Sequence, residues 1–469
     1  MKANTIQQTH NHTLIGIVAA TLVIYLGLTL VAGIPTGINT FFFWGGIVLL
    51  LGFLIAMLAL GWHLLSRPLA PGLKAKSSTT IFSDTFRISV ALWAMLASTM
   101  GTIGGIWDAG WHIKYGIPFG EDFFWMPHRF IYFSLFTPIL VALYTWVQFI
   151  KRGKGTLQQR LRADIPLSLI MLGGLSMAVI LPLDPLWHLI YGEDLTGLSI
   201  PHTIFTVVNA VTRIGVFTLF LGYFPRPAAW RPLFKANHAE LAILLISSLN
   251  IIVMVLTLVT DWEGANRLAI ASDATFMGLI TARPDYSLIL TMTLTAVFPT
   301  AWGAYATRLT GFSTMAWLLS FMAREGLYLL FGHQVLPETW LMLLPIVLGV
   351  DLVLWLNSRR NQPLSLPLMA AIIAVVTTLT TVPLVGILYT VPTITPTNTP
   401  IMTLAAFLTA WVALWLGRTL GDYCYQCERN PAKEGILVVN HAYWQSVLGV
   451  VSACILFTVW FIVMTDPPV

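Results

Sequence analysis

Charged side chains are scarce in this sequence: Asp, Glu, Lys and Arg make up 10% of its 469 residues, against about 25% in soluble globular proteins. Hydrophobic residues make up 57%, above the soluble norm of about 45–50%. The chain has only three cysteines, which say little about its redox compartment, and no glycine-rich phosphate loop, nucleophile elbow or cofactor fingerprint. The scarcity of charge excludes a soluble globular protein and predicts an integral membrane protein.

Long apolar runs are the clearest feature that is present, and about 13 of them reach the roughly 20 residues that a helix needs to cross a bilayer. Backbone polar groups in lipid must be satisfied within the segment, so these runs predict helices; a transmembrane β-barrel would show short alternating stretches instead. The sequence therefore predicts an all-α, polytopic transmembrane helix bundle. The runs lie at 13–34, 41–65, 88–107, 128–150, 166–187, 202–224, 239–260, 286–308, 312–331, 338–357, 366–390, 400–418 and 444–465.

Lysine and arginine gather in alternate loops, so the net charge of +5 reflects topology, and we expect no nucleic-acid partner. By the positive-inside rule these loops and the amino terminus are cytoplasmic, and the carboxyl terminus is outside. We expect an anchoring helix hairpin with a cytoplasmic linker over 1–80, a metal-site bundle over 81–238, and a C-terminal bundle of unknown role over 239–469. The basic loops contain Arg67, Lys74, Lys76, Arg87, Lys151, Arg152, Lys154, Arg160, Arg162, Arg226, Arg231, Lys235, Arg359, Arg360, Arg418, Arg429 and Lys433.

One pattern occurs twice, each time at the junction of two apolar runs. The first copy covers 107–112 and 126–128, and the second covers 184–188 and 200–202. In each copy an aspartate and a histidine stand four positions apart, on one face of a helix, and a second histidine opens the next run. A carboxylate with two imidazoles suits a divalent transition metal. We therefore predict two metal sites near the outer face, with the ligands Asp108, His112 and His128 in one and Asp184, His188 and His202 in the other.

Each motif also has a simpler interpretation, in which Asp108 caps or hydrogen-bonds His112 and the neighbouring tryptophans anchor the membrane interface. The recurrence of the whole pattern, including an acidic pair between the two histidines, favours metal binding. Other polar residues are candidates for orienting the ligands, although ordinary loop chemistry or helix–helix hydrogen bonding would also account for them. These candidates are Glu121, Asp122, Asn209 and Arg213.

The first motif resembles the copper motif of the C subunit of the copper membrane monooxygenases, the particulate methane and ammonia monooxygenases. That family has an Asp, a His four positions on and a His opening the next helix, as at Asp108, His112 and His128. Its downstream Asn, His and His correspond to 184, 188 and 202, where this chain has Asp in place of Asn. The similarity runs over about residues 85–225. The helices after 239 have no counterpart in that subunit.

The resemblance implies copper, dioxygen and a small substrate such as methane, ammonia or a short hydrocarbon, with partner membrane subunits and a site in the cytoplasmic (inner) membrane of a prokaryote. The ligand types alone leave iron and zinc open, while an outward-facing site and the high affinity of Cu(II) favour copper. The alternative functions are a multispanning transporter or metal-handling protein, in which the triads hold cations transiently, and a structural subunit with inert histidines. A repeat at the outer edge, not the bilayer centre, argues against transport.

Ionisable residues also fall inside the C-terminal runs. Arg324, Glu325 and Asp351 either mark a proton or ion path or are satisfied by pairing. Cys424 and Cys427 form a Cys-x-x-Cys that we expect in a cytoplasmic loop, and one such pair is too little for a zinc site. Small residues over 101–105 predict a close approach between two helices.

Overall fold

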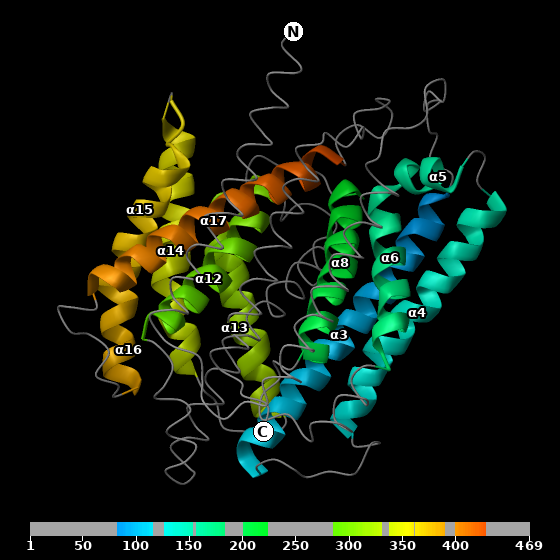
Figure 1. Cartoon of the computed structure of the whole chain (residues 1–469), viewed down its shortest axis with the longest axis horizontal. Helices are drawn as coiled ribbons and strands as arrows, with labels where there is room; N and C mark the ends of the chain where they lie inside the picture. The colour runs from blue at the N-terminus through cyan, green and yellow to red at the C-terminus, as the bar shows by residue number, and fades with distance from the viewer. Residues whose placement is uncertain are drawn as a thin grey trace, which may run out of the picture. The chain divides into compact units, whose positions relative to one another are not determined.

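The structure, a computed structural model, describes part of the chain, and every secondary-structure element in that part is a helix (Figure 1). The described residues are 82–115, 126–152, 156–182, 200–223, 285–330, 337–360, 362–389 and 399–427. The helices are α3 (Asp84–Tyr115), α4 (Met126–Arg152), α5 (Leu157–Ala163), α6 (Ile165–Ile180), α8 (Ile200–Tyr223), α12 (Asp285–Thr307), α13 (Phe312–Leu330), α14 (Pro337–Arg359), α15 (Leu366–Val376), the π-helical turn η2 (Thr377–Thr381), α16 (Val382–Tyr389) and α17 (Thr399–Cys427). The all-α prediction is confirmed for this part of the chain.

Each expected apolar run within the described residues coincides with a helix, and the run at 366–390 is divided into α15, η2 and α16. The runs at 13–34, 41–65, 239–260 and 444–465 lie outside the described residues. Among the residues that the structure describes, five helical segments are long and apolar enough to cross a membrane: Thr85–Asp108, Pro127–Arg152, Leu341–Arg359, Leu366–Leu384 and Thr399–Asp422. These segments make the chain an integral membrane protein, and its described part is all-helical.

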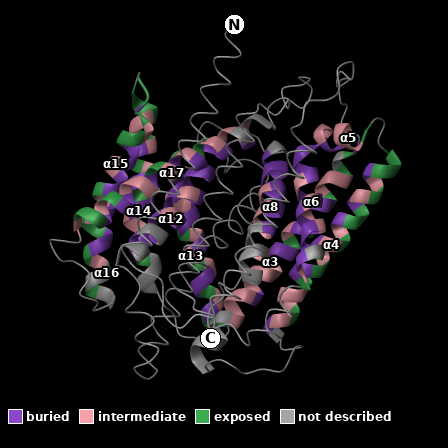
Figure 2. Ribbon diagram, viewed as in Figure 1, coloured by how far each residue is buried: buried purple, intermediate pink, exposed green. Residues whose placement is uncertain are grey.

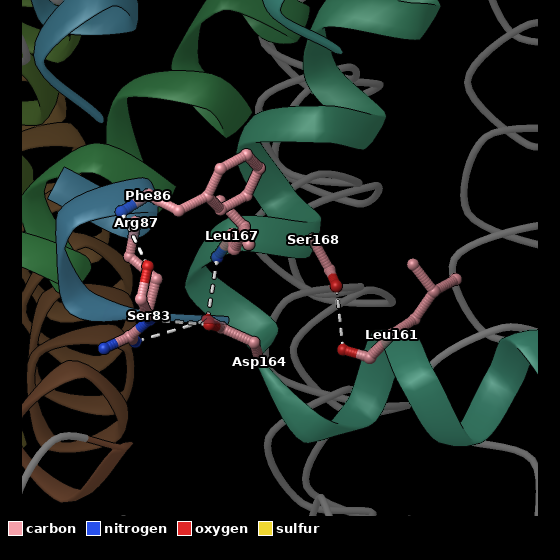
Figure 3. A network of polar contacts seen from close by, with 7 residues as sticks. All are labelled: Ser83, Phe86, Arg87, Leu161, Asp164, Leu167 and Ser168. Atoms are coloured by element: carbon pink, nitrogen blue, oxygen red, sulfur yellow. Dashed lines mark hydrogen bonds and ion pairs between the residues drawn. The ribbon is translucent and has the colours of Figure 1, made fainter. Parts of the chain in front are cut away.

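A sharp corner of 116° separates α5 from α6, and together these helices could form a sixth crossing. Asp164 occupies the corner, where its carboxylate binds Arg87 at the start of α3 through Nε (2.6 Å) and Nη2 (3.3 Å). Asp164 also accepts a hydrogen bond from the backbone N–H of Leu167, which caps α6. Figure 3 shows these contacts converging on a side chain that is 1% exposed. The corner is thus held by a buried, two-pronged ion pair.

The chain divides into two compact units: unit 1 comprises residues 1–101, 132–223 and 426–469, and unit 2 comprises 102–131 and 224–425. In unit 1, glycines set the close approach of neighbouring helices. A Cβ at Gly101 of α3 would lie 2.5 Å from Ser134 Oγ of α4, and a Cβ at Gly215 of α8 would lie 2.8 Å from Pro166 O of α6. Gly174 of α6 likewise packs against the α4 backbone. These contacts join α3, α4, α6 and α8 as a helical bundle.

In unit 2, α12 and α17 pack side by side through a second pair of glycines. A Cβ at Gly417 would lie 2.9 Å from the backbone N of Trp302, and one at Gly421 would lie 2.5 Å from Tyr305 Cβ. The contacts advance in the same direction along both helices, so α12 and α17 are parallel. Their ends are joined by an ion pair of 2.6 Å between Arg308 and Asp422.

Mid-helix charges in unit 2 are satisfied by partners nearby. Asp351 of α14 accepts hydrogen bonds from the backbone N–H of Ser313 (3.3 Å) and Thr314 (2.8 Å), so it caps the start of α13. Arg324 and Glu325 are both buried and form an ion pair of 3.0 Å. These contacts favour the pairing interpretation of the intramembrane charges over a proton or ion path.

The Cys-x-x-Cys does not lie in a loop, as the sequence had led us to expect. Helix α17 continues through Cys427, and Cys424 is buried within it, where its sulfur accepts a hydrogen bond of 3.4 Å from Trp302 Nε1. No proline interrupts the chain between Arg418 and Cys427, and the Arg308–Asp422 ion pair stabilises this last part of the helix. Cys424 is therefore a packing residue between α12 and α17.

Candidate metal site

The carboxylate of the first motif and the histidine that follows it are brought together at the junction of α3 and α4. Both belong to unit 2, Asp108 in the last two turns of α3 and His128 in the first turn of α4. His128 Nε2 lies 3.2 Å from Asp108 Oδ1. The side chains are 30% and 22% exposed, respectively, so the pair is largely buried.

A glycine one turn before Asp108 explains how the two helices come so close. A Cβ on Gly104 would lie 2.8 Å from Phe130 Cβ and 2.9 Å from Pro127 O, distances that side chains do not tolerate. Trp107 then packs edge-to-face on Phe130 with their ring centroids 6.0 Å apart. Gly104 and this aromatic contact fix the separation of α3 and α4 at the level of the pair. The sequence suggested the small-residue contact, but it did not identify Phe130 and Pro127 as the surface opposite Gly104.

The separation of the two atoms fits two adjacent ligands of one metal ion. Imidazole nitrogen and carboxylate oxygen bind zinc-sized divalent ions at about 2.0–2.2 Å, which places neighbouring donor atoms about 3 Å apart. Metal binding to this pair requires an unprotonated Nε2, whose lone pair would hold the ion together with the carboxylate oxygen.

The third predicted ligand of this site, His112, lies in α3 one turn beyond Asp108. That spacing places the two residues on the same face of the helix. The side chain of His112 is outside those described, as are Glu121 and Asp122 between the two helices. No group of three His, Cys, Asp or Glu side chains that could hold a metal occurs among the residues that are described. The structure thus brings together Asp108 and His128 of the predicted triad.

The second motif begins its helix, α8, with the same Pro-His pair that begins α4 in the first motif. His202 is the third residue of α8 and follows Pro201, as His128 is the third residue of α4 and follows Pro127. Proline suits the first turn of a helix because its missing N–H would have no partner there. Asp184 and His188 lie outside the described residues, and so does the side chain of His202. In the described residues, the repeat therefore appears as a helix that begins with Pro-His in both copies.

Two residues predicted to support the ligands contact one another. Arg213 Nε donates to Asn209 Oδ1 (3.3 Å), and Arg213 Nη2 donates to Ser98 O of α3 (3.4 Å). Arg213 is 5% exposed. These hydrogen bonds join α8 to α3, so the described contacts correspond to the helix–helix interpretation of Asn209 and Arg213.

The fold and this site define an integral membrane protein in which an aspartate and a histidine meet where two helices join. Comparison with protein families, with curated proteins and with solved structures found no match to this chain. Its function is therefore argued from its own residues.

Proposed function

We propose that this protein is a membrane metalloprotein that binds a divalent transition metal, in the first instance copper, through Asp108, His112 and His128. The observation that supports the site is the 3.2 Å approach of His128 Nε2 to Asp108 Oδ1, because these residues are 20 positions apart on two helices. A second site of the same kind is formed by Asp184, His188 and His202. Bound copper would supply the capacity to react with dioxygen, for the oxidation of a small substrate such as a hydrocarbon or ammonia.

The chain's own residues have separate tasks in this proposal. Asp108 supplies the anionic oxygen that favours a divalent ion, and the imidazoles of His112 and His128 supply neutral nitrogen. Three protein ligands leave coordination positions for water, dioxygen or substrate. Gly104 and the Trp107–Phe130 contact hold Asp108 and His128 at a fixed separation before the ion arrives.

The proposed topology has about 13 spans, with the amino terminus inside and both sites near the outer face. Parallel packing of α12 and α17 supports this arrangement. Along the chain, α13, α14 and the α15–α16 segment separate the two helices, so the chain reverses direction four times and α17 runs the same way as α12. Arg308 and Arg418 meet at Asp422 at the shared end of these helices. The positive-inside rule assigns that end to the cytoplasm.

Metal analysis of the purified full chain tests the proposal. Asp108→Asn and His128→Ala are each expected to lower the copper bound per chain, and His112→Ala is expected to do the same. Asp422→Asn and His441→Ala are matched controls, since they remove a carboxylate and an imidazole outside both motifs. Wild-type protein without copper, or equal copper in the His128→Ala and His441→Ala variants, would overturn it. Metal uptake into proteoliposomes at the same site would indicate transport instead of oxidation.

A further inference from the structure

In unit 1 the short helix α5 places a basic side chain against the end of the long helix α4. Arg160 of α5 donates from Nη1 to the carbonyl oxygens of Phe149 and Ile150, both at 2.8 Å. These carbonyls belong to the last turn of α4, so Arg160 caps that helix. Thr156 begins α5 with a reciprocal capping box to Gln159. Together with the Arg87–Asp164 ion pair beyond α5, which Figure 3 shows, these bonds fix the path of the chain from α4 to α6.

Four basic residues belong to the last turn of α4 and to α5, and we call this segment the α4–α5 corner: Lys151, Arg152, Arg160 and Arg162. Lys151 and Arg152 are exposed, and Arg160 and Arg162 are partly exposed. The cations offset the partial negative charge at the carboxyl end of α4, which would otherwise repel an anion. Because a guanidinium presents several N–H groups in one plane, it matches the oxygens of a phosphate group.

An exposed apolar surface of α4 leads directly to these cations. Its members recur at spacings of three or four residues, so they share one side of the helix. They are Phe136 (52% exposed), Leu140 (66%), Tyr144 (55%), Val147 (39%) and Ile150 (52%). Figure 2 shows exposed residues along α4 as far as its end. In a membrane-spanning helix such a side faces the acyl chains of lipids, and its basic end lies at the level of their headgroups.

We propose that the α4–α5 corner binds an anionic phospholipid, whose phosphate lies among the four cations and whose acyl chains lie along the exposed side of α4. The charge complementarity selects an anionic headgroup over a zwitterionic one, and the apolar surface selects a lipid over a free phosphate. A bound lipid would contact both α4 and α5 and so stabilise the segment that connects α4 to α6. This site is independent of the metal proposal, because none of its residues belongs to either Asp/His motif.

Lipid titration of the detergent-purified full chain, followed by native mass spectrometry, tests this site. The probes are phosphatidylglycerol and phosphatidylcholine with identical acyl chains. Each basic residue near a membrane surface contributes enough affinity that the Lys151→Gln/Arg152→Gln variant should bind phosphatidylglycerol about 30-fold more weakly. The matched control is Arg359→Gln/Arg360→Gln, which removes an exposed basic pair at the end of α14. It should stay within about threefold of wild type.

The outcomes separate the possible ligands. A wild-type preference for phosphatidylglycerol that is lost in the α4 variant and kept in the α14 variant supports the site. Equal affinity of wild type for the two lipids, or an equal loss in both double variants, overturns it. Displacement of bound phosphatidylglycerol by millimolar inorganic phosphate would show a free-anion site and would also overturn the proposal. Lys151 and Arg152 are exposed, so their loss leaves the packing of the bundle intact.

Discussion

The two ends of α3 each place a charged residue against a partner outside α3, but the two partners differ in kind. Near the start, Arg87 binds Asp164, whose carboxylate is 1% exposed and also caps α6. Near the end, Asp108 faces the imidazole of His128, and both side chains remain partly exposed. The first contact satisfies a carboxylate with a permanent cation and with the backbone N–H of Leu167. The second leaves a carboxylate beside a group that can release its proton.

That difference separates structural from functional use of aspartate in this membrane protein. A buried carboxylate that is neutralised by arginine and by backbone N–H groups has no further ligand to accept. A partly exposed carboxylate beside an imidazole offers oxygen and nitrogen to an incoming ion. Asp351 belongs with Asp164, because its oxygens are engaged by Ser313 and Thr314 at the start of α13.

The largest effect should come from breaking the buried ion pair. Asp164→Ala leaves Arg87 with its charge in a site where it is 11% exposed, and it removes the cap of α6. Loss of one partner of a buried pair costs about 3–5 kcal/mol, which unfolding of the purified protein in detergent would measure. Asp422→Ala, which breaks a pair with the more exposed Arg308, should cost at most about 1 kcal/mol. Equal losses in the two variants would remove the distinction between buried and exposed pairs.

A smaller effect on stability, with a specific effect on metal, is expected at Gly104. In Gly104→Ala the new Cβ meets Phe130 and Pro127, so the two helices must move apart, at a cost of about 1–3 kcal/mol. The displacement should weaken metal binding about 10–100-fold, as for other changes that disturb the residues supporting a ligand. Gly105→Ala is the matched control, because a Cβ there meets nothing within 4 Å. It should leave metal content unchanged and should not lower stability.

The smallest effect should follow from removal of the Asp351 cap. Asp351→Ala frees the backbone N–H groups of Ser313 and Thr314, and loss of a helix cap costs about 0.5–2 kcal/mol. We expect metal content and any pH dependence of activity to match the wild type. Thermal unfolding and a pH–activity profile measure the two quantities. A changed pH–activity profile with unchanged stability would restore the proton-path interpretation and make Asp351 a functional aspartate, like Asp108.

Local pattern was enough to predict the helices, the small-residue contact at Gly101 and Gly104, and the meeting of Asp108 with His128. Contacts between distant segments could not be predicted in the same way. The cap of α13 joins residues 37 and 38 positions apart, and the Arg87–Asp164 pair joins residues 77 apart. Helix α17 extends beyond the expected end of its apolar run, where Arg308, the residue that follows α12, forms an ion pair with Asp422. Hydropathy alone carries no information about such a partner.

The central claim is most directly tested by electron paramagnetic resonance of Cu(II) added to the purified protein. Our account predicts that the wild-type signal shows nitrogen couplings from two imidazoles per site. In the His128→Ala variant, the copper of the first site should show couplings from one imidazole fewer. Asp108→Asn should lower occupancy of the same site, while His441→Ala should leave the spectrum unchanged. A wild-type spectrum without imidazole nitrogen, or one identical in wild type and His128→Ala, would contradict the metal site at the junction of α3 and α4.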